Sequence, residues 1–279
     1  MKGRLFIPSY RRSDKILLKS RTLSFISKEW LPYTTFVVRE DEADVYKKVL
    51  EPYPVSLAVI PSKTIENKQK ETGREFMWAD TMDDILDDIL ASCIGYQENI
   101  VIMDDDLTFA YRPFMGTASP VRMTENAWND MMQLLMLSDK SCPLSGIPQR
   151  GFVTSKQEEL DINAPLYGVF GVSVEFFGEH TDYRFCNTGA IHMPDRALVL
   201  KLLQNGYTTR VYNRYCTNDV ADTSGGCSLN RTAKDHSASA IALKREYPDL
   251  VDLTTKTNLG DVRIGTRVQW SKAFKESPQ

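Results

Sequence analysis

Residues 100–109 read IVIMDDDLTF, and this stretch bears on both the fold and the site. Four apolar residues lead directly into Asp104, Asp105 and Asp106. A continuous, β-branched apolar run is typical of a strand that is covered on both faces. Carboxylates at the end of such a strand are costly to bury unless a cation neutralises them. The stretch therefore predicts a buried strand that ends in a metal site, with a solvated turn of no function as the alternative.

Three earlier apolar runs have the same character, and each also ends in polar residues. Amphipathic patterns typical of helices lie between the runs, over residues 13–30, 42–50 and 76–93. Alternating strands and helices predict an α/β fold that is doubly wound around a mostly parallel central sheet. The three earlier runs cover residues 5–7, 34–38 and 57–60.

The second half of the chain is less regular. We expect one compact domain over residues 1–279, with no repeat and no linker. The patterns predict helices over 124–137, 194–205 and 238–247, strands over 166–173, 174–177 and 208–212, and a loop over 219–230.

Composition places the chain among ordinary globular proteins. It has 279 residues, of which 42% are hydrophobic and 25% charged, with a net charge of −3. This hydrophobic fraction is enough for a packed core, and the slightly negative net charge does not favour tight nonspecific binding to nucleic acid. Five cysteines without CxxC spacing argue against a zinc ribbon or a disulfide framework. We find no signal peptide and no apolar segment of membrane-spanning length, so we expect a soluble cytoplasmic protein.

The polar ends of the four predicted strands are expected to share one edge of the sheet. In open α/β sheets, ligands bind beyond the carboxyl ends of the strands. Arginines and carboxylates together at this edge predict a site for a phosphate-bearing ligand and a metal, because Mg²⁺ and Mn²⁺ prefer hard oxygen ligands. The four clusters are Ser9–Arg12, Arg39–Asp41, Pro61–Lys63 and Asp104–Asp106.

A strand followed by DxD at the close of an N-terminal α/β half resembles the GT-A glycosyltransferases. The opening FIPSYRR is similar to their first strand and nucleotide-contacting loop, and the likeness covers residues 4–110 and, more loosely, 183–245. It implies a GT-A-like fold in which residues 1–112 bind a nucleotide sugar and residues 113–279 bind the acceptor. The segments IPSYRR, GREFMWAD, VIMDDDLTF and TSGGCSLNRT also resemble bacteriophage glycosyltransferases that modify hydroxymethylated pyrimidines in DNA. The host cytoplasm would then be the place of action.

The resemblance also implies roles for individual residues around a UDP-sugar or similar donor and a Mn²⁺ or Mg²⁺ ion. Asp104 would contact the ribose, Asp106 would hold the metal, and Arg39 would lie near the base or ribose. His236 is the first candidate for a further metal ligand, and His192 is the second. The whole donor-binding set is Pro8, Ser9, Tyr10, Arg11, Arg39, Arg74, Asp80, Asp104 and Asp105.

Transfer with inversion needs a carboxylate that takes the proton of the acceptor hydroxyl. Asp219 and Asp222, in TNDVADTSGG, lie where GT-A enzymes often place this base. A retaining enzyme would not need it, and the stereochemistry stays open. Arg11, Arg12 and Arg74 are candidates to stabilise the leaving diphosphate.

Other functions remain as alternatives. The same fold would serve a protein, glycan or small-molecule acceptor, a nucleotidyltransferase that makes a nucleotide sugar, or a noncatalytic DNA-associated module. A nucleotidyltransferase usually has a glycine-rich, lysine-bearing loop after the first strand, and FIPSYRRSDK lacks one. A DNA acceptor requires basic residues for its phosphates and aromatic residues for its bases near the site. The candidates are Arg112, Arg122, Lys140, Arg150, Lys156, Arg210, Arg214 and Arg231, with Tyr111, Tyr212 and Tyr215.

Overall fold

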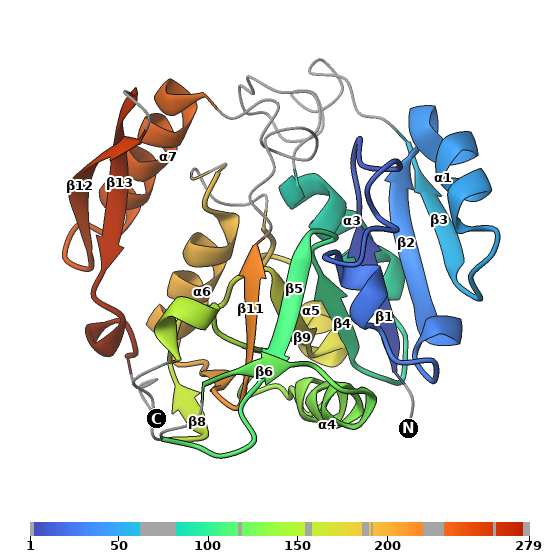
Figure 1. Ribbon diagram of the computed structural model, residues 1–279. Coiled ribbons are helices and arrows are strands. Elements are labelled where there is room, and N and C mark those ends of the chain that lie inside the picture. The colour runs from blue at the N-terminus through green and yellow to red at the C-terminus, as the bar shows by residue number, and fades with distance from the viewer. Residues whose placement is uncertain are drawn as a thin grey trace.

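An eight-stranded sheet forms the centre of the computed structural model (Figure 1), in the order β3-β2-β1-β4-β9-β7-β10-β8. The structure describes residues 3–61, 82–116, 119–153, 158–185, 190, 192–219, 232–258 and 261–275. The strands are β1 Arg4–Pro8, β2 Thr34–Arg39, β3 Ser56–Ile60, β4 Ile100–Met103, β7 Leu144–Gly146, β8 Leu160–Ile162, β9 Val169–Val172 and β10 Thr209–Tyr212.

The four N-terminal strands are parallel neighbours, as the sequence predicted. β1 pairs with β2 and β4, and β2 pairs with β3, all in parallel register. In the rest of this sheet, β9 runs against β4 and β7, and β8 runs against β10. A mostly parallel α/β sheet is therefore confirmed, and it draws its strands from both halves of the chain.

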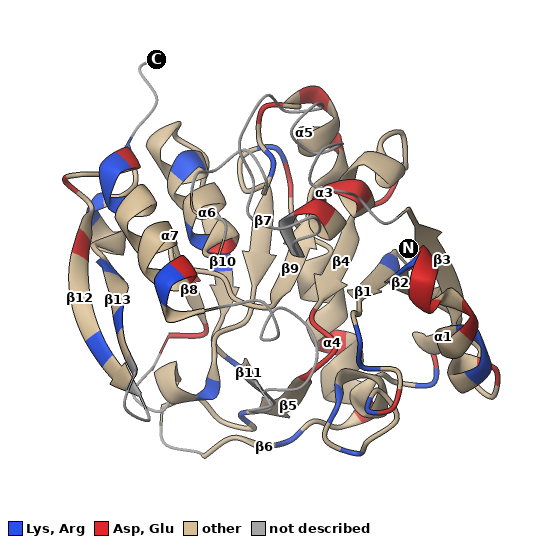
Figure 2. Ribbon diagram, turned by 90° about the horizontal axis from the view of Figure 1, so that it is seen from above, with Lys and Arg blue, Asp and Glu red and all other residues tan. Residues whose placement is uncertain are grey.

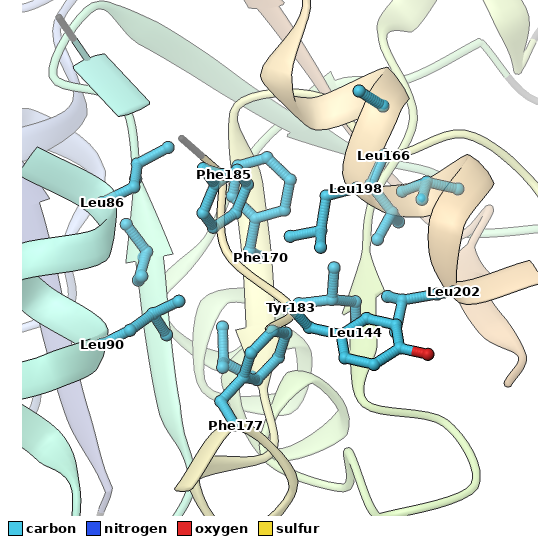
Figure 3. Close-up of a cluster of buried hydrophobic side chains, with 14 of the residues drawn as sticks. Leu86, Leu90, Leu144, Leu166, Phe170, Phe177, Tyr183, Phe185, Leu198 and Leu202 are labelled. Carbon is cyan, nitrogen blue, oxygen red and sulfur yellow. The ribbon is translucent and has the colours of Figure 1, made fainter. Parts of the chain in front are cut away.

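Helices cover both faces of this sheet. They are α1 Ala43–Leu50, α3 Met82–Cys93, α4 Glu125–Leu135, α5 Val174–Glu179, α6 Pro194–Gln204 and α7 Ala233–Glu246. Ile100 and Ile102 of β4 pack into the cluster formed with α3 and α6, while Val101 and Met103 pack into the cluster with α1 and α4. Figure 3 shows side chains of α3 on one side and of α6 on the other, around Phe170. Burial on both faces explains why the β4 sequence is continuously apolar.

Two smaller β units complete the fold. A three-stranded sheet has the order β11-β5-β6, with β5 Leu107–Tyr111, β6 Val121–Arg122 and β11 Tyr215–Asp219. A hairpin of β12 Val251–Asn258 and β13 Asp261–Val268 packs against α7, at one side of the molecule in Figure 1. Short 3-10 helices cover Thr22–Phe25, Leu31–Tyr33, Glu40–Glu42, Arg150–Phe152 and Trp270–Lys272. No helix in the described parts of the chain is long and apolar enough to cross a membrane.

Three sequence predictions of local structure were wrong. Residues 13–30 form turns and a 3-10 helix, because most of their backbone hydrogen bonds close short local turns and Thr22 N donates to Asp105 O after β4. Residues 174–177 belong to α5, whose N-cap Ser173 accepts a hydrogen bond from Phe176 N. The last predicted helix begins earlier than expected, since Thr232 and Asp235 form a capping box.

Candidate functional site

The three aspartates after β4 form an acidic turn that is packed onto the segment after β1. Arg12 Nη1 lies 2.5 Å from Asp105 Oδ1 and 2.8 Å from Asp106 Oδ2. Ser9 Oγ donates to Asp105 Oδ2 and lies 2.7 Å from the Tyr46 hydroxyl. Tyr46 also accepts a hydrogen bond from Arg12 N at 3.0 Å. These contacts join the carboxyl ends of β1 and β4 into one polar cluster.

Asp105 is the interior member of this turn, with 4% of its surface exposed. Burial raises its pKa, although the charge of Arg12 acts in the opposite direction. Burial alone would lower the pKa of Arg12, but Asp105 and Asp106 more than offset this and raise it. Arg12 therefore stays charged, and it supplies the neutralising cation that a buried carboxylate needs. The position of Asp105 is that of a supporting residue beneath the site.

Thr22 holds the backbone of the acidic turn. Its Oγ1 donates to Asp104 O at 2.6 Å and accepts from Leu107 N at 3.1 Å. Its own N–H donates to Asp105 O at 3.3 Å. Thr22 is fully buried, so these polar groups have little access to water. The sequence carried no signal for this role, because Thr22 lies within a stretch that has helical spacing.

Asp104 lies against Gly168, the residue before β9. Asp104 N donates to Gly168 O at 2.9 Å. Gly168 has φ +63°, and a Cβ at this position would lie 3.0 Å from Asp104 Oδ2. The left-handed backbone and the close approach both favour glycine. Asp104 and Asp106 are partly exposed, so these two carboxylates are the ones that the turn presents outward.

Of the predicted nucleotide cradle, Tyr10 and Arg11 reach the surface, whereas Pro8 and Ser9 are buried. The Arg11 guanidinium lies 5.0 Å from the centre of the Tyr10 ring. Arg11 has φ +52°, and its N–H donates to Glu42 Oε1 at 2.8 Å. Positive φ is uncommon for a residue with a side chain and often marks a functional segment. Burial raises the pKa of Glu42, which the hydrogen bond from Arg11 partly opposes.

Arg39 points into the protein rather than outward. Its side chain is 1% exposed, donates to Pro61 O at 2.9 Å and pairs with Asp88 at 3.5 Å. Asp88 belongs to α3, whose sequence MDDILDDILASC is rich in aspartates and which carries red bands in Figure 2. Arg39 thus ties the ends of β2 and β3 to α3.

The register of β11 brings one predicted catalytic residue to the acidic turn. Asp219 is the partner of Leu107 in the antiparallel pairing of β11 with β5, and Leu107 directly follows Asp106. Thr108 Oγ1 donates to Asn218 O at 3.3 Å in the same pairing. The backbone at position 219 therefore lies beside the end of the turn. Asp222, Arg74 and Asp80 lie outside the described residues.

His236 lies on α7, where its Nδ1 is 3.0 Å from Ile264 O of β13. In the neutral ring this contact makes Nδ1 the donor and Nε2 the basic nitrogen, an arrangement common in metal-binding histidines. His192 N donates to Ser239 Oγ at 3.2 Å. Both histidines are thus anchored to the α7 region.

The acidic turn fits a particular kind of cation site. Over the ranges that the structure describes, no three His, Cys, Asp or Glu side chains gather into a metal-binding group. Mg²⁺ is often held by one or two carboxylates and completes its shell with phosphate oxygens and water. Asp104 and Asp106 have the donor chemistry for such a bridging ion, and Arg12 cancels only part of the charge of the turn.

Most of the described basic and aromatic residues considered for DNA binding are buried or ion-paired, and a few arginines are exposed. Arg112 is buried and donates to Val153 O, Lys140 pairs with Glu175 and Glu179, and Arg210 pairs with Asp139. Tyr212 and Tyr215 are buried, Tyr111 is half-buried, and Lys156 and Arg231 lie outside the described residues. The exposed arginines of this set are Arg122, Arg150 and Arg214.

No protein-family model and no curated protein matches the chain. Among solved structures, it is similar to a 4-diphosphocytidyl-2C-methyl-D-erythritol synthase from Anaerococcus prevotii, with 11% identity, coverage of 86% of this chain and 96% of the other, and a TM-score of 0.44. It is also similar to a mannose-1-phosphate geranyltransferase from Thermus thermophilus, with 13% identity, coverage of 79% of this chain and 76% of the other, and a TM-score of 0.43. For mouse xyloside xylosyltransferase 1 the identity is 9%, the coverage is 74% of this chain and 76% of the other, and the TM-score is 0.37. Likenesses this distant assign no chemistry to the chain.

Proposed function

We propose that this protein is a metal-dependent glycosyltransferase that moves a sugar from a nucleoside diphosphate sugar to a hydroxyl group. The observation that carries the proposal is the acidic turn after β4, which is packed against the Arg12 segment that follows β1 at the carboxyl edge of a parallel sheet. This edge is where α/β sheets bind ligands. The acceptor is a hydroxymethylated pyrimidine in DNA, which rests on the likeness of IPSYRR and VIMDDDLTF to bacteriophage enzymes.

The donor lies across the ends of β1 and β4 in this proposal. Tyr10 and Arg11 would contact the nucleoside, Asp104 would accept from the ribose, and Asp106 would hold the ion, with His236 as a further ligand. The bound cation would neutralise the diphosphate and make it a better leaving group. Arg12 is committed to Asp105 and Asp106 and keeps the carboxylates in position.

Transfer breaks the bond between the anomeric carbon and the diphosphate oxygen, which leaves with the bonding electrons. The acceptor oxygen forms the new bond to the anomeric carbon and gives its proton to a carboxylate. The pairing of Asp219 opposite Leu107 supports this residue as the base, and Asp222 follows three residues later as the second candidate.

The experiment is a panel of nucleotide sugars with Mn²⁺ or Mg²⁺, assayed with hydroxymethylated DNA, plain DNA and no DNA. Release of nucleoside diphosphate that depends on hydroxymethylated DNA supports the proposal. Pyrophosphate release from a nucleoside triphosphate and a sugar phosphate would instead identify a nucleotidyltransferase. Equal nucleoside diphosphate release from all three samples would reject the DNA acceptor.

Asp106→Ala tests the metal assignment by calorimetry. We expect the cation-dependent part of donor affinity to disappear, while Asp130→Ala, which removes an exposed carboxylate on α4, serves as the matched control. Unchanged affinity of Asp106→Ala in the presence of Mn²⁺ would remove this ligand.

The base is tested separately with Asp219→Asn and Asp222→Asn. Loss of general base catalysis should lower turnover by about 10²–10⁴-fold in one of them, with donor binding retained. Normal turnover in both variants would exclude these carboxylates.

A further inference from the structure

An exposed aromatic side chain from the second half of the chain lies near the acidic turn. Phe152 belongs to the 3-10 helix Arg150–Phe152 and exposes 57% of its surface. Its ring is stacked on Tyr167, with 6.4 Å between the ring centres and 26° between the planes. Apolar surface left in water is unfavourable, and covering it with a ligand recovers that free energy. The exposed face of the Phe152 ring is therefore a flat apolar surface on which a ligand can stack.

This ring pair is connected to the acidic turn by a short path. Tyr167 precedes Gly168, whose carbonyl accepts from Asp104 N at 2.9 Å. The Asp104 carboxylate also closely approaches Gly168. A molecule resting on Phe152 would thus approach the carboxylates from the half of the chain that follows β5.

Arginines lie beside the ring pair, together with the carboxylate of Asp195, whose charge acts on Tyr167. Arg150 is exposed, donates to Pro120 O at 3.2 Å, and forms no ion pair with any residue that the structure describes. Its guanidinium has five N–H donors, so it can also bind a phosphate. Arg196 lies 5.7 Å from the centre of the Tyr167 ring and donates to Thr266 Oγ1 at 2.7 Å. Aromatic rings beside arginines suit nucleic acid, because bases stack and phosphates pair with guanidinium groups.

We propose that Phe152 and Tyr167 form a stacking platform for the base of the acceptor nucleotide, or of its neighbour in a single strand, with Arg150 on the adjacent phosphate. This inference rests on the proposed function and assigns the acceptor contacts that the sequence left open. The chain as a whole has a net charge of −3, so a strand of DNA needs a local basic contact of this kind.

The test uses the full chain and a fluorescently labelled single-stranded oligonucleotide that contains hydroxymethylated pyrimidine, with affinity followed by anisotropy. Removing one base–aromatic stack is worth about tenfold in affinity, so Phe152→Ala should bind about tenfold more weakly and Phe152→Trp should retain binding. Arg150→Ala should weaken binding and lower the salt dependence by about one phosphate contact. Leu137→Ala is the matched control, because Leu137 has a similar exposure of 58% and lies just after α4.

Donor affinity, measured by calorimetry on the same proteins, separates this inference from the proposed function. Weaker DNA binding by Phe152→Ala with unchanged donor affinity supports the platform. Equal DNA binding by the wild type, Phe152→Ala and Leu137→Ala overturns it and leaves the glycosyltransferase proposal standing. Binding of a glycan oligomer, and not DNA, that is lost in Phe152→Ala would also overturn the nucleobase assignment. Failure of the wild type to bind any nucleotide sugar would count against the proposed function itself.

Discussion

Arg12 and Asp105 form a buried ion pair that joins the ends of β1 and β4, with 2.5 Å between Nη1 and Oδ1. The same nitrogen also contacts Asp106, so a single guanidinium orients two of the three aspartates. The acidic turn is therefore held in position by the protein itself, before any ligand arrives. Such preorganisation of a charged site is what the proposed donor diphosphate and its cation would require.

Arg12→Ala should be strongly destabilising, because it leaves the Asp105 carboxylate buried without its cation. Removing one partner of a buried pair costs about 3–5 kcal/mol. Urea denaturation measures this change in the free energy of unfolding. Arg214→Ala, at an exposed position, is the control and should change stability by less than about 0.5 kcal/mol. Equal effects of the two substitutions would mean that the pair does not act as described.

Thr22→Val should loosen the acidic turn while preserving the shape of the side chain. Valine cannot bond Asp104 O or Leu107 N, and each buried polar group left unpaired costs about 1–3 kcal/mol. Thr22→Ser keeps the hydroxyl and loses only a methyl group, about 0.8 kcal/mol. We expect denaturation to rank the valine variant below the serine variant. The opposite order would show that packing, rather than hydrogen bonding, is the contribution of Thr22.

Gly168→Ala should affect both stability and the position of Asp104. A side chain at φ +63° costs about 1–2 kcal/mol, and the added Cβ would also meet Asp104 Oδ2. Gly95→Ala is the matched control, since Gly95 has φ +93° and an added Cβ there would meet nothing within 4 Å. Both variants should lose stability on heating, whereas donor affinity should fall only in Gly168→Ala. A similar loss of affinity in Gly95→Ala would point to a general effect of unfolding.

Glu42→Gln should change how stability depends on pH. Burial raises the pKa of Glu42 above its unfolded value, so the folded state binds more protons in the interval between the two pKa values. Stability therefore falls as the pH rises through that interval, and the ionised form is the costly one above it. Glutamine removes this cost but keeps an oxygen that can accept from Arg11 N.

Denaturation of the wild type and Glu42→Gln at pH 7 and pH 4 checks this expectation. The variant should be the more stable protein at pH 7, with a difference that shrinks toward pH 4. A difference that grows on acidification would contradict the direction of the pKa shift.

Much of the N-terminal half was predictable from local patterns. The runs at 5–7, 34–38, 57–60 and 100–103 became β1 to β4, and the predicted polar residues 9–12, 39–41 and 104–106 follow β1, β2 and β4 at the edge that these strands share. The central strands of this set are buried on both faces, so their residues must be apolar and the pattern is strong. The helix over 124–137 was equally clear, because Thr124 caps it and its apolar spacing follows one face.

Other features were hidden because distant parts of the chain create them. The segment 13–30 has helical spacing but bonds instead to the acidic turn through Thr22. The pairing of β5 with β11 joins Thr108 to Asn218, which are 110 positions apart, so no local pattern could predict it.

The residues without a sequence signal were those that support the site by holding other site residues in position. Tyr46, Thr22 and Glu42 support the site from outside the motifs, through hydrogen bonds to Ser9, Asp104 and Arg11. In the sequence, such a residue cannot be distinguished from an ordinary helix or turn residue. Its role becomes visible only when its partner is known.

The amino-acid sequence by itself determined that buried parallel strands carry their polar residues to one edge, because burial on two faces demands unbroken apolar runs that end where the chain meets water. The tertiary structure alone decided which of the three aspartates faces inward and which two face outward. That choice depends on Ser9 and Arg12, which follow β1, and on Gly168, which precedes β9, and these residues meet Asp104–Asp106 only after the sheet has formed.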